Sequence, residues 1–328
     1  MAVALPAARR FLLDRQRLQG LMPLLALVVL FAISALISRS VGYGREFLQA
    51  GNLLNILRQS SYSGIVALGM TFVIIGGGID LSVGSMMAFV GVLAVATLNA
   101  AGGGYGAVVL TAATAVALGV AFGTANGLII TKGRIAPFIV TLGSMSIFRS
   151  LALWQRQGGM IQSQSDLYEP LGSSSVLAVP TPIWIWLVLA VLANVLLNRT
   201  RYGRHICAVG SNEKVAQYSA IRVDRARVAS YAIVGAMVGV SAVLWTARLN
   251  SMSSTNFGKD VELDSIAAAV IGGTPLTGGR GSIWGTFIGA IILGMINNML
   301  NMAGVDVYLQ GTVKGAVIIA AVLIQRKL

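Results

Sequence analysis

The sequence predicts an all-α, polytopic membrane protein, because it is strongly apolar, carries little charge and is rich in glycine. Of its 328 residues, 56% are hydrophobic and 11% are charged, whereas soluble domains carry roughly 25% charged residues. The 39 glycines suit transmembrane helices, since a small residue lets two helix backbones approach closely. We therefore expect a single transmembrane domain over residues 1–328, with little mass outside the bilayer.

Apolar segments long enough to cross a bilayer, which takes about 20 residues, recur along the chain. The segment that begins at Asp264 is short, so it either crosses the membrane or re-enters on the same side. Residues 47–59 carry Leu53, Leu54 and Leu57 on one side, which predicts an amphipathic helix at the membrane interface. The ten expected spans lie near residues 21–38, 60–77, 82–101, 106–131, 136–153, 181–198, 229–248, 264–275, 282–303 and 307–325.

Charge sets the expected topology. The net charge is +13, and the basic residues gather between apolar spans, as the positive-inside rule describes. The N-terminal segment 1–20, the loop 199–228 and the pair Arg326–Lys327 are therefore expected in the cytoplasm, which requires an even number of spans. The basic residues form no continuous stripe with aromatic partners, which excludes a nucleic-acid-binding protein. The acidic residues expected to face outward are Asp166, Glu169, Asp260, Glu262 and Asp264.

Residues that usually carry catalysis or metal binding are scarce in this sequence. A single cysteine, Cys207, excludes an internal disulfide, and a single histidine, His205, excludes a histidine metal cluster. The sequence contains no GxxxxGK[ST] motif, so this chain has no P-loop for ATP. We expect no catalytic residue, no metal site and no cofactor bound by this chain.

The most informative motif is GGGIDLSVGS, Gly76–Ser85, which places Asp80 between a triple glycine and a small polar turn. A carboxylate and irregular backbone at membrane depth are tolerated only where protein or a water-filled cavity surrounds them. A similar pattern recurs in Ala269–Phe287, and paired interrupted helices build the substrate path of many transporters. The alternative is that these glycines only ease helix packing. The candidate pathway or hinge residues are Gly76, Gly77, Gly78, Asp80, Ser82, Gly84, Ser85, Gly272, Gly273 and Thr274.

Several polar residues have more than one interpretation. Asp80 either caps the next helix by accepting backbone amides, holds the glycine turn open, or bonds a substrate. Asp264 is expected to cap a helix over 265–275, and Ser82 and Ser85 to serve helix packing. Lys314 either snorkels to the interface or lines a cavity. Four asparagines either bond between helices or line a path: Asn126, Asn297, Asn298 and Asn301.

The longest stretch outside the spans, Arg199–Val228, is expected to contain one short helix. Ser211 or Asn212 is placed to cap its first free amides. An apolar stripe then follows at helical spacing, formed by Val215, Tyr218 and Ile221. Such a stripe suits docking into a groove on a partner protein, or packing against the membrane surface or the protein's own helix ends.

Four segments in order, from about Gly51 to the C-terminus, resemble the permease subunits of bacterial ABC importers for monosaccharides of the ribose, xylose, arabinose and galactose type. They are GMTFVIIGGGIDLSVGS, APFIVTLG, YGRHICAVGSNEKVAQYSAIRV and VELDSIAAAVIGGTPLTGGRGSIWGT. The resemblance implies the ten-helix architecture of vitamin B12-type (type II) importers, in the bacterial inner membrane. It also implies a second permease copy or a similar sister, a separate cytoplasmic ATPase that binds ATP and magnesium, and a periplasmic sugar-binding protein.

The same resemblance places a coupling helix, which meets the ATPase, in the loop 199–228. ATP binding would then drive alternating access, with ribose as the first expected substrate. The loop departs from the family pattern where Val215-Ala216 replaces Ala-Ala and Ala220 replaces a glycine, a change expected to stiffen a helix. The acids Asp260, Glu262 and Asp264 are expected to face the binding protein. The expected coupling residues are Gly210, Ser211, Asn212, Glu213, Val215, Ala216, Tyr218, Ser219 and Ile221.

Two rival function classes fit the sequence less well. A secondary carrier or channel that works without an ATPase normally shows paired membrane acids or a proton-relay histidine, and here Asp80 stands alone. A membrane enzyme needs a cluster of acids or metal ligands at an interface. The sugar itself is not readable from the chain, because the binding protein does most of the selecting. Ribose-like pentoses, hexoses, inositol and the furanosyl autoinducer are all compatible with the resemblance, and ribose is the first expectation. Some relatives move nucleosides, and the related branched-chain amino-acid permeases share the architecture.

Overall fold

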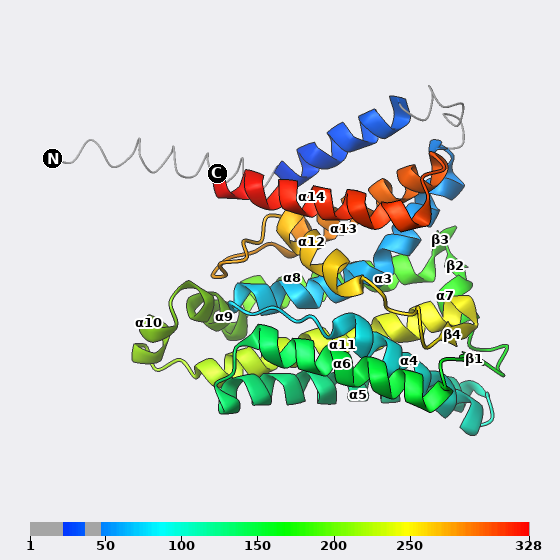
Figure 1. Ribbon diagram of the computed structural model, residues 1–328, viewed down its shortest axis with the longest axis horizontal. Helices are drawn as coiled ribbons and strands as arrows, with labels where there is room; N and C mark the ends of the chain where they lie inside the picture. The colour runs from blue at the N-terminus through cyan, green and yellow to red at the C-terminus, as the bar shows by residue number, and fades with distance from the viewer. Residues whose placement is uncertain (1–21, 37–46, 328) are drawn as a thin grey trace.

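The computed structural model describes residues 22–36 and 47–327, and this part of the chain is mostly helical (Figure 1). The N-terminal segment 1–20 expected in the cytoplasm lies outside the described residues. In chain order the helices are Met22–Leu36, α3 (Ala50–Ile75), α4 (Val83–Ala100), α5 (Tyr105–Gly133), α6 (Pro137–Arg156), α7 (Pro170–Ser173), α8 (Thr181–Arg199), α9 (Arg201–Ser211), α10 (Glu213–Tyr218), α11 (Val223–Leu249), α12 (Val261–Ile271), α13 (Ile283–Met302) and α14 (Val307–Lys327).

Every expected span overlaps one of these helices. Within the described part of the chain, six of them are long and apolar enough to cross a membrane: α4, α5, α6, α8, α11 and α13. The predicted all-α, polytopic architecture is confirmed at this level. The number of crossings and the side on which the termini lie stay predictions.

Helix α3 is the centre of the bundle. Every residue from Gly64 to Ile75 is buried, and α3 packs against α8, α11, α12 and α13. A helix that is apolar all round belongs in a core rather than at a surface. The separate interfacial helix expected over 47–59 is wrong, because α3 already begins at Ala50 and runs unbroken to Ile75. No proline occurs between these residues, and the single glycines Gly51, Gly64 and Gly69 are tolerated within the helix.

Glycines set the distance between α5 and α11, which share a long contact. A Cβ placed on Gly119 would overlap the carbonyl of Gly235, and a Cβ on Gly235 would overlap the carbonyl of Gly119. The two backbones therefore touch, as small residues allow in membrane helix pairs. This close contact accounts for part of the high glycine content.

Two helices are interrupted where the sequence predicts it. Helix α3 ends at Ile75 and α4 begins at Val83, and an extended stretch of chain connects them (Figure 1). Helix α12 ends at Ile271, and α13 begins only at Ile283. The 11 residues of α12 rise ~16 Å, which is about half of a bilayer core roughly 30 Å thick. Helix α12 is therefore a half-length helix.

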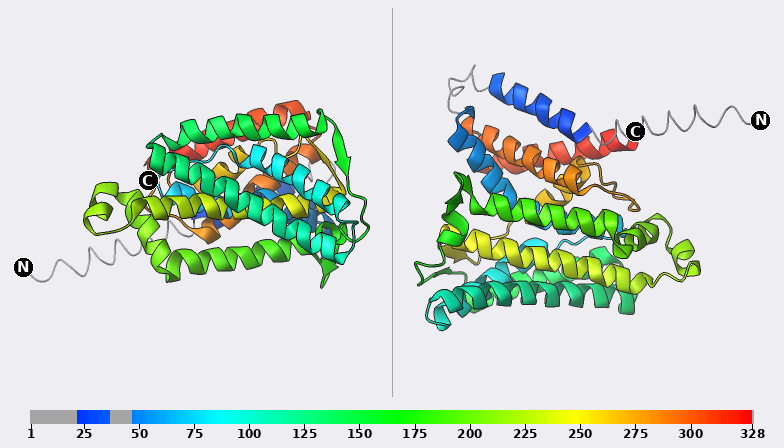
Figure 2. Two further views of the ribbon diagram at one scale, coloured as in Figure 1. Left: turned by 90° about the horizontal axis from the view of Figure 1, so that it is seen from below. Right: turned by 180° about the vertical axis from the view of Figure 1, so that it is seen from behind.

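The two ends of the bundle differ. Helices α9 and α10 extend from one end, where α14 also finishes, and we call this the α9–α10 end (Figures 1 and 2). The opposite end carries two small antiparallel sheets: β1 (Met160–Gln162) with β4 (Ser251–Ser253), and β2 (Ser175–Val176) with β3 (Val179–Pro180). We call it the β-strand end.

Candidate functional site

The two helix interruptions meet in space, although about 200 residues separate them. The amide of Gly279 donates a hydrogen bond of 2.8 Å to the carbonyl of Ile75, the last residue of α3. One turn away, the hydroxyls of Thr71 and Thr286 lie 2.7 Å apart and share a hydrogen bond in the buried core. The internal similarity seen in the sequence therefore corresponds to a direct contact, which we call the break junction.

The end of α9 completes the break junction. A Cβ on Gly210 would overlap the carbonyl of Ile75 and would lie 2.6 Å from the amide nitrogen of Gly279. A Cβ on Gly279 would in turn lie too close to Ser211, the residue after Gly210. The side chain of Ile206 fills the space beside Gly76. The segment 199–228 thus contacts both interruptions at once, and at Gly210 the backbones lie so close that no side chain fits between them.

Asp80 lies in the extended stretch and is fully buried, with 0% of its surface exposed. Its Oδ1 accepts hydrogen bonds from the amide of Ser82 at 2.8 Å and from the Ser82 hydroxyl at 2.6 Å. The chain of bonds continues, since Asn126 donates to the Ser82 hydroxyl and accepts from Ser144. Asp80 thus fixes the turn that precedes α4 and links it to α5 and α6. In this conformation the carboxyl group is closed off from solvent.

The start of α12 packs on the start of α4. The backbones of Gly84 and Gly258 are in contact, and the Glu262 carboxylate lies so close to Gly84 that no side chain fits there. Among the three acids expected to face outward at this point, Asp260 is exposed, whereas Glu262 and Asp264 are half-buried. The three acids therefore differ in exposure, and their expected role in facing the binding protein stays a prediction.

Asp264 does not cap a helix, so that expectation is wrong. Helix α12 begins earlier, at Val261, and Asp264 lies in its first turn. Its carboxylate instead pairs with Lys314 of α14, whose Nζ lies 3.2 Å from Oδ1 and 3.3 Å from Oδ2. Lys314 therefore points to a charged partner inside the protein rather than to the interface. The ion pair fastens the half-length helix α12 to α14.

The segment 199–228 contains two complete helices, α9 and α10, and the start of α11, whereas the sequence predicted one short helix there. In the predicted helix, α10, Asn212 is the cap, because its side chain accepts the amide of Val215 at 3.1 Å. Helix α9 was missed, although its buried residues Gly203, Ile206 and Val209 follow helical spacing. Thr200 caps it by accepting the amide of Gly203.

Helix α10 presents an apolar surface away from the bundle. Val215 is 57% exposed and Tyr218 is 89% exposed, while Ala216 is buried against the protein. Arg227 of α11 holds the helix through an ion pair of 2.7 Å with Glu213. The predicted stripe stops at Tyr218, since α10 ends there and Ile221 lies beyond it.

Ala220 is not inside a helix, contrary to the expectation that it stiffens one. It follows α10 with φ +59°, in the left-handed region where a glycine is favoured and a Cβ is strained. Its amide donates to the carbonyl of Gln217, and the amide of Ile221 donates to the carbonyl of Ala216. The alanine therefore adds strain to the turn that ends α10.

Cys207 and His205 lie on α9, outside the membrane-spanning helices. His205 is exposed and Cys207 is half-buried. Burial raises the pKa of the Cys207 thiol above its ordinary value, which lowers its reactivity because the thiolate is the nucleophile. In the described part of the chain no group of three or more His, Cys, Asp or Glu side chains is placed to hold a metal ion.

Comparison with known proteins identifies the family. The family described as "Branched-chain amino acid transport system / permease component" matches residues 52–322. The chain belongs to this family. This permease is 42% identical over 308 residues to the ribose import permease protein RbsC of Escherichia coli (strain K12), which covers 93% of this chain and 92% of the relative.

Two further relatives support the assignment. The ribose import permease protein RbsC of Bacillus subtilis (strain 168) is 41% identical over 316 residues, 94% of each chain. The D-allose transport system permease protein AlsC of Escherichia coli (strain K12) is 35% identical over 280 residues, 85% of each chain. No solved structure gives a significant match. The permease is therefore a multi-pass protein of the inner membrane and a transport subunit rather than an enzyme.

The structure brings the predicted pathway residues of the permease together in part. Gly76, Gly77 and Gly78 lie in the interruption after α3, while Gly272, Gly273 and Thr274 directly follow α12. Ser82, Gly84 and Ser85 lie at the start of α4, and Ser82 and Ser85 are buried. The sequence motifs did not reveal Gly279 as the partner of Ile75 and Gly210. The coupling residues Gly210 and Ser211 end α9, and Ser219 follows α10.

Proposed function

We propose that this permease is the transmembrane subunit of an ATP-driven ABC importer that moves a monosaccharide, with ribose as the first candidate, into the cytoplasm. The relatives named for ribose and D-allose are similar to this chain over most of its length. The observation that carries the mechanism is the break junction, where Gly210, Ile75 and Gly279 are in backbone contact. Movement of the segment 199–228 would reach both interruptions directly.

The proposed topology follows from charge and helix count. Ten crossings, with the Met22–Leu36 helix as the first and α14 as the last, place both termini and the α9–α10 end in the cytoplasm. This end carries Arg199, Arg201 and Arg204, as the positive-inside rule requires. The β-strand end then faces the periplasm. The architecture corresponds to that of vitamin B12-type importers.

The proposed partners match the two ends. A cytoplasmic ATPase, which binds ATP and magnesium, docks on α10, where Val215 and Tyr218 are exposed. A periplasmic sugar-binding protein docks at the β-strand end, where Asp166, Glu169 and Asp260 are exposed. A second copy of the chain or a similar permease completes the path. The permease itself binds no cofactor.

The proposed cycle is alternating access. Closure of the ATPase on ATP would draw α10 inward, and the ion pair between Glu213 and Arg227 would pass that displacement to α11. The contact of Gly210 with Ile75 and Gly279 would pass it to α3 and to the loop before α13. The path would then open outward to receive sugar, and hydrolysis would reset it. The alternative is a carrier that works without an ATPase.

Copurification tests the proposal. Tagged permease is extracted from native membranes in a mild detergent, and the bound proteins are identified by mass spectrometry. We expect an ATPase with Walker motifs, which Tyr218→Arg removes or weakens. The matched control is Tyr105→Arg, because Tyr105 is also exposed, at 77%, but lies at the opposite end. Sugar transport by the chain alone in liposomes, with no ATPase recovered, would replace the importer with the carrier.

A further inference from the structure

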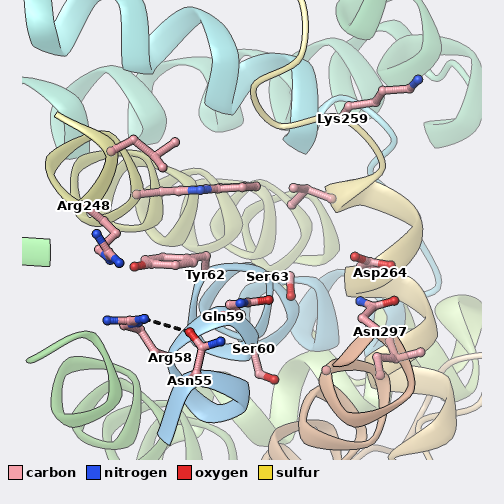
Figure 3. Close-up of a pocket in the computed structure, with 15 residues that line it drawn as sticks. Asn55, Arg58, Gln59, Ser60, Tyr62, Ser63, Arg248, Lys259, Asp264 and Asn297 are labelled. Carbon is pink, nitrogen blue, oxygen red and sulfur yellow. Dashed lines mark hydrogen bonds between the residues drawn. The ribbon is translucent and has the colours of Figure 1, made fainter. Parts of the chain in front are cut away.

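A cavity of about 390 Å³ opens near the β-strand end, between α3, α11, α12 and α13 (Figure 3). Its volume lies in the range of small-ligand pockets, roughly 300–1,000 Å³. The lining comes from the first half of α3, the end of α11, the start of α12 and the second half of α13. None of the residues in the break junction lines it, so it is a separate feature of the permease.

One wall of the cavity is aromatic. The rings of Tyr62 and Trp245 stack with centroids 5.5 Å apart and planes 9° apart, and Trp245 packs on Phe257 at 4.9 Å. This wall is rigid because each ring is held by its neighbour. The flat face of an aromatic ring suits the apolar C–H face of a pyranose or furanose, while the tyrosine hydroxyl offers a polar contact.

Two residues that line the cavity each carry a buried polar atom with no hydrogen-bond partner among the described residues. These atoms are the hydroxyl of Tyr62 and Oδ1 of Asn297. Leaving a buried polar group unpaired costs about 1–3 kcal/mol, and a ligand that reaches such a group supplies the missing hydrogen bond. The neighbouring Asn298 differs, since it exchanges hydrogen bonds with Asn52.

Charged and polar side chains line both ends of the cavity. The guanidinium groups of Arg58 and Arg248 lie beside Tyr62 at one end, and Asp264 and Asn297 lie at the other, on the same side as Lys259 (Figure 3). The donors of the arginine end thus face a mixture of acceptors and donors across the space. The charge of Asp264 is balanced by Lys314. A ligand that carries both donors and acceptors along its length fits this arrangement, whereas a simple anion would satisfy only the arginine end.

We propose that this cavity is a binding site for an uncharged monosaccharide, which stacks on the Tyr62–Trp245 wall and hydrogen-bonds to Arg58, Arg248, Asp264 and Asn297. The proposal rests on the proposed function, and it adds a sugar site within one permease chain. Each sugar hydroxyl donates and accepts, so the ring can bridge both ends. In the proposed topology the cavity lies in the periplasmic half, where sugar arrives.

Cysteine protection tests occupancy without ATP or partner proteins. The full chain carries Cys207→Ser and Ser63→Cys, because Ser63 lines the cavity, and the rate of maleimide modification is measured with D-ribose, D-xylose, D-allose or the acid D-ribonate. We expect the uncharged sugars to slow modification several-fold and D-ribonate to have little effect. The control variant Tyr218→Cys, at the α9–α10 end, should be modified at the same rate with each of the four compounds.

Variants then locate the site. Tyr62→Phe removes only the hydroxyl, and Asn297→Leu removes the amide at similar volume, so each should weaken protection on the order of threefold to tenfold. Asn298→Leu is the matched control, since it removes an amide from the same helix outside the cavity lining, and it should retain protection. Loss of protection in all three variants alike would overturn the site.

The assembled importer separates this proposal from the proposed function. Permease, ATPase and binding protein are reconstituted in liposomes, and ATP-dependent uptake of D-ribose is measured. If ATP-dependent uptake is observed but no sugar slows maleimide modification of the Ser63→Cys variant, the cavity site is overturned and the importer assignment stands. Protection by D-ribonate alone would overturn the uncharged ligand. No ATP-dependent uptake of any sugar by the unaltered complex would overturn the proposed function itself.

Discussion

Nη2 of Arg227 lies 2.7 Å from Oε2 of Glu213, and this ion pair joins the six-residue helix α10 to the long helix α11. The side chains are 25% and 43% exposed, so solvent screens the pair and it adds little to stability. Its importance is positional, because α10 has few other contacts with α11 and carries the exposed Val215 and Tyr218.

Breaking this ion pair should impair coupling more than folding. We expect Glu213→Gln to change the free energy of unfolding by less than about 1 kcal/mol but to lower ATP-dependent uptake in liposomes several-fold. Arg227→Gln should have the same effect, and the two changes together should cost little more than one alone. Strictly additive losses in this double-mutant cycle would show that the pair transmits nothing.

Gly210→Ala should disrupt the break junction. The added methyl would overlap the carbonyl of Ile75 and approach the amide of Gly279, and neither backbone group can rotate away. Overpacking of this kind costs about 1–3 kcal/mol, so both the melting temperature and uptake should fall. Gly143→Ala on α6 is the control, since its Cβ would meet open space. Wild-type uptake by Gly210→Ala would rule out the junction as the transmission route.

Ala220→Gly should stabilise the permease. The left-handed φ of +59° is strained for alanine, so glycine should gain about 0.5–1 kcal/mol after its greater chain entropy in the unfolded state is counted. Thermal unfolding of the purified protein measures the change. Ala216→Gly, in the buried face of α10, should have the opposite sign. A lower melting temperature for Ala220→Gly would contradict the assignment of strain.

Asp80 should prove more important for folding than for sugar contact. Asp80→Ala leaves the amide and hydroxyl of Ser82 without their acceptor, and such a loss in the interior costs about 1–3 kcal/mol. Asp80→Asn keeps an acceptor oxygen and should lose less. Thermal unfolding ranks the two variants. If Asp80→Ala unfolds like the wild type yet loses sugar protection, Asp80 contacts substrate instead.

Cys207 should react slowly and with a marked pH dependence. Because burial raises its pKa, the thiolate fraction at neutral pH is lower than for a free cysteine, and it grows as the pH rises. Maleimide labelling should therefore be slow at pH 7 and accelerate towards pH 9. An exposed cysteine from Tyr218→Cys, in a Cys207→Ser background, should react faster at pH 7. Equal labelling rates at positions 207 and 218 would contradict the conclusion that burial slows the reaction of Cys207.

The sequence was sufficient for local features and insufficient for contacts between distant segments. The interruption after Ile75 was predictable because three glycines and Asp80 end an apolar run. The pairing of Asp264 with Lys314, 50 residues away, was not, since nothing in either local pattern specifies the other. Helix α9 was hidden because its basic residues suggested only a loop. The positive φ of Ala220 likewise could not be predicted from the residue type.

The aromatic cavity was also beyond the sequence. Tyr62, Trp245 and Asn297 lie on three different helices, and each alone fits ordinary helix packing. Only the position of Asn297 beside a cavity, with its neighbour Asn298 turned to Asn52, distinguishes two adjacent asparagines of the same type. The proposed sugar site therefore depended on tertiary arrangement, whereas the transport class did not.

The contact among Ile75, Gly210 and Gly279 is made by backbone atoms, which every amino acid shares. Such a contact cannot distinguish one substrate from another, so a change of substrate need not alter it. The side chains that differ in size, charge and hydrogen bonding lie some way off, in the cavity between α3 and α13. In the proposed mechanism the break junction transmits movement and the cavity binds the sugar, so the two roles are physically separable. New sugars could then be accommodated by altering the cavity wall while the break junction stays the same.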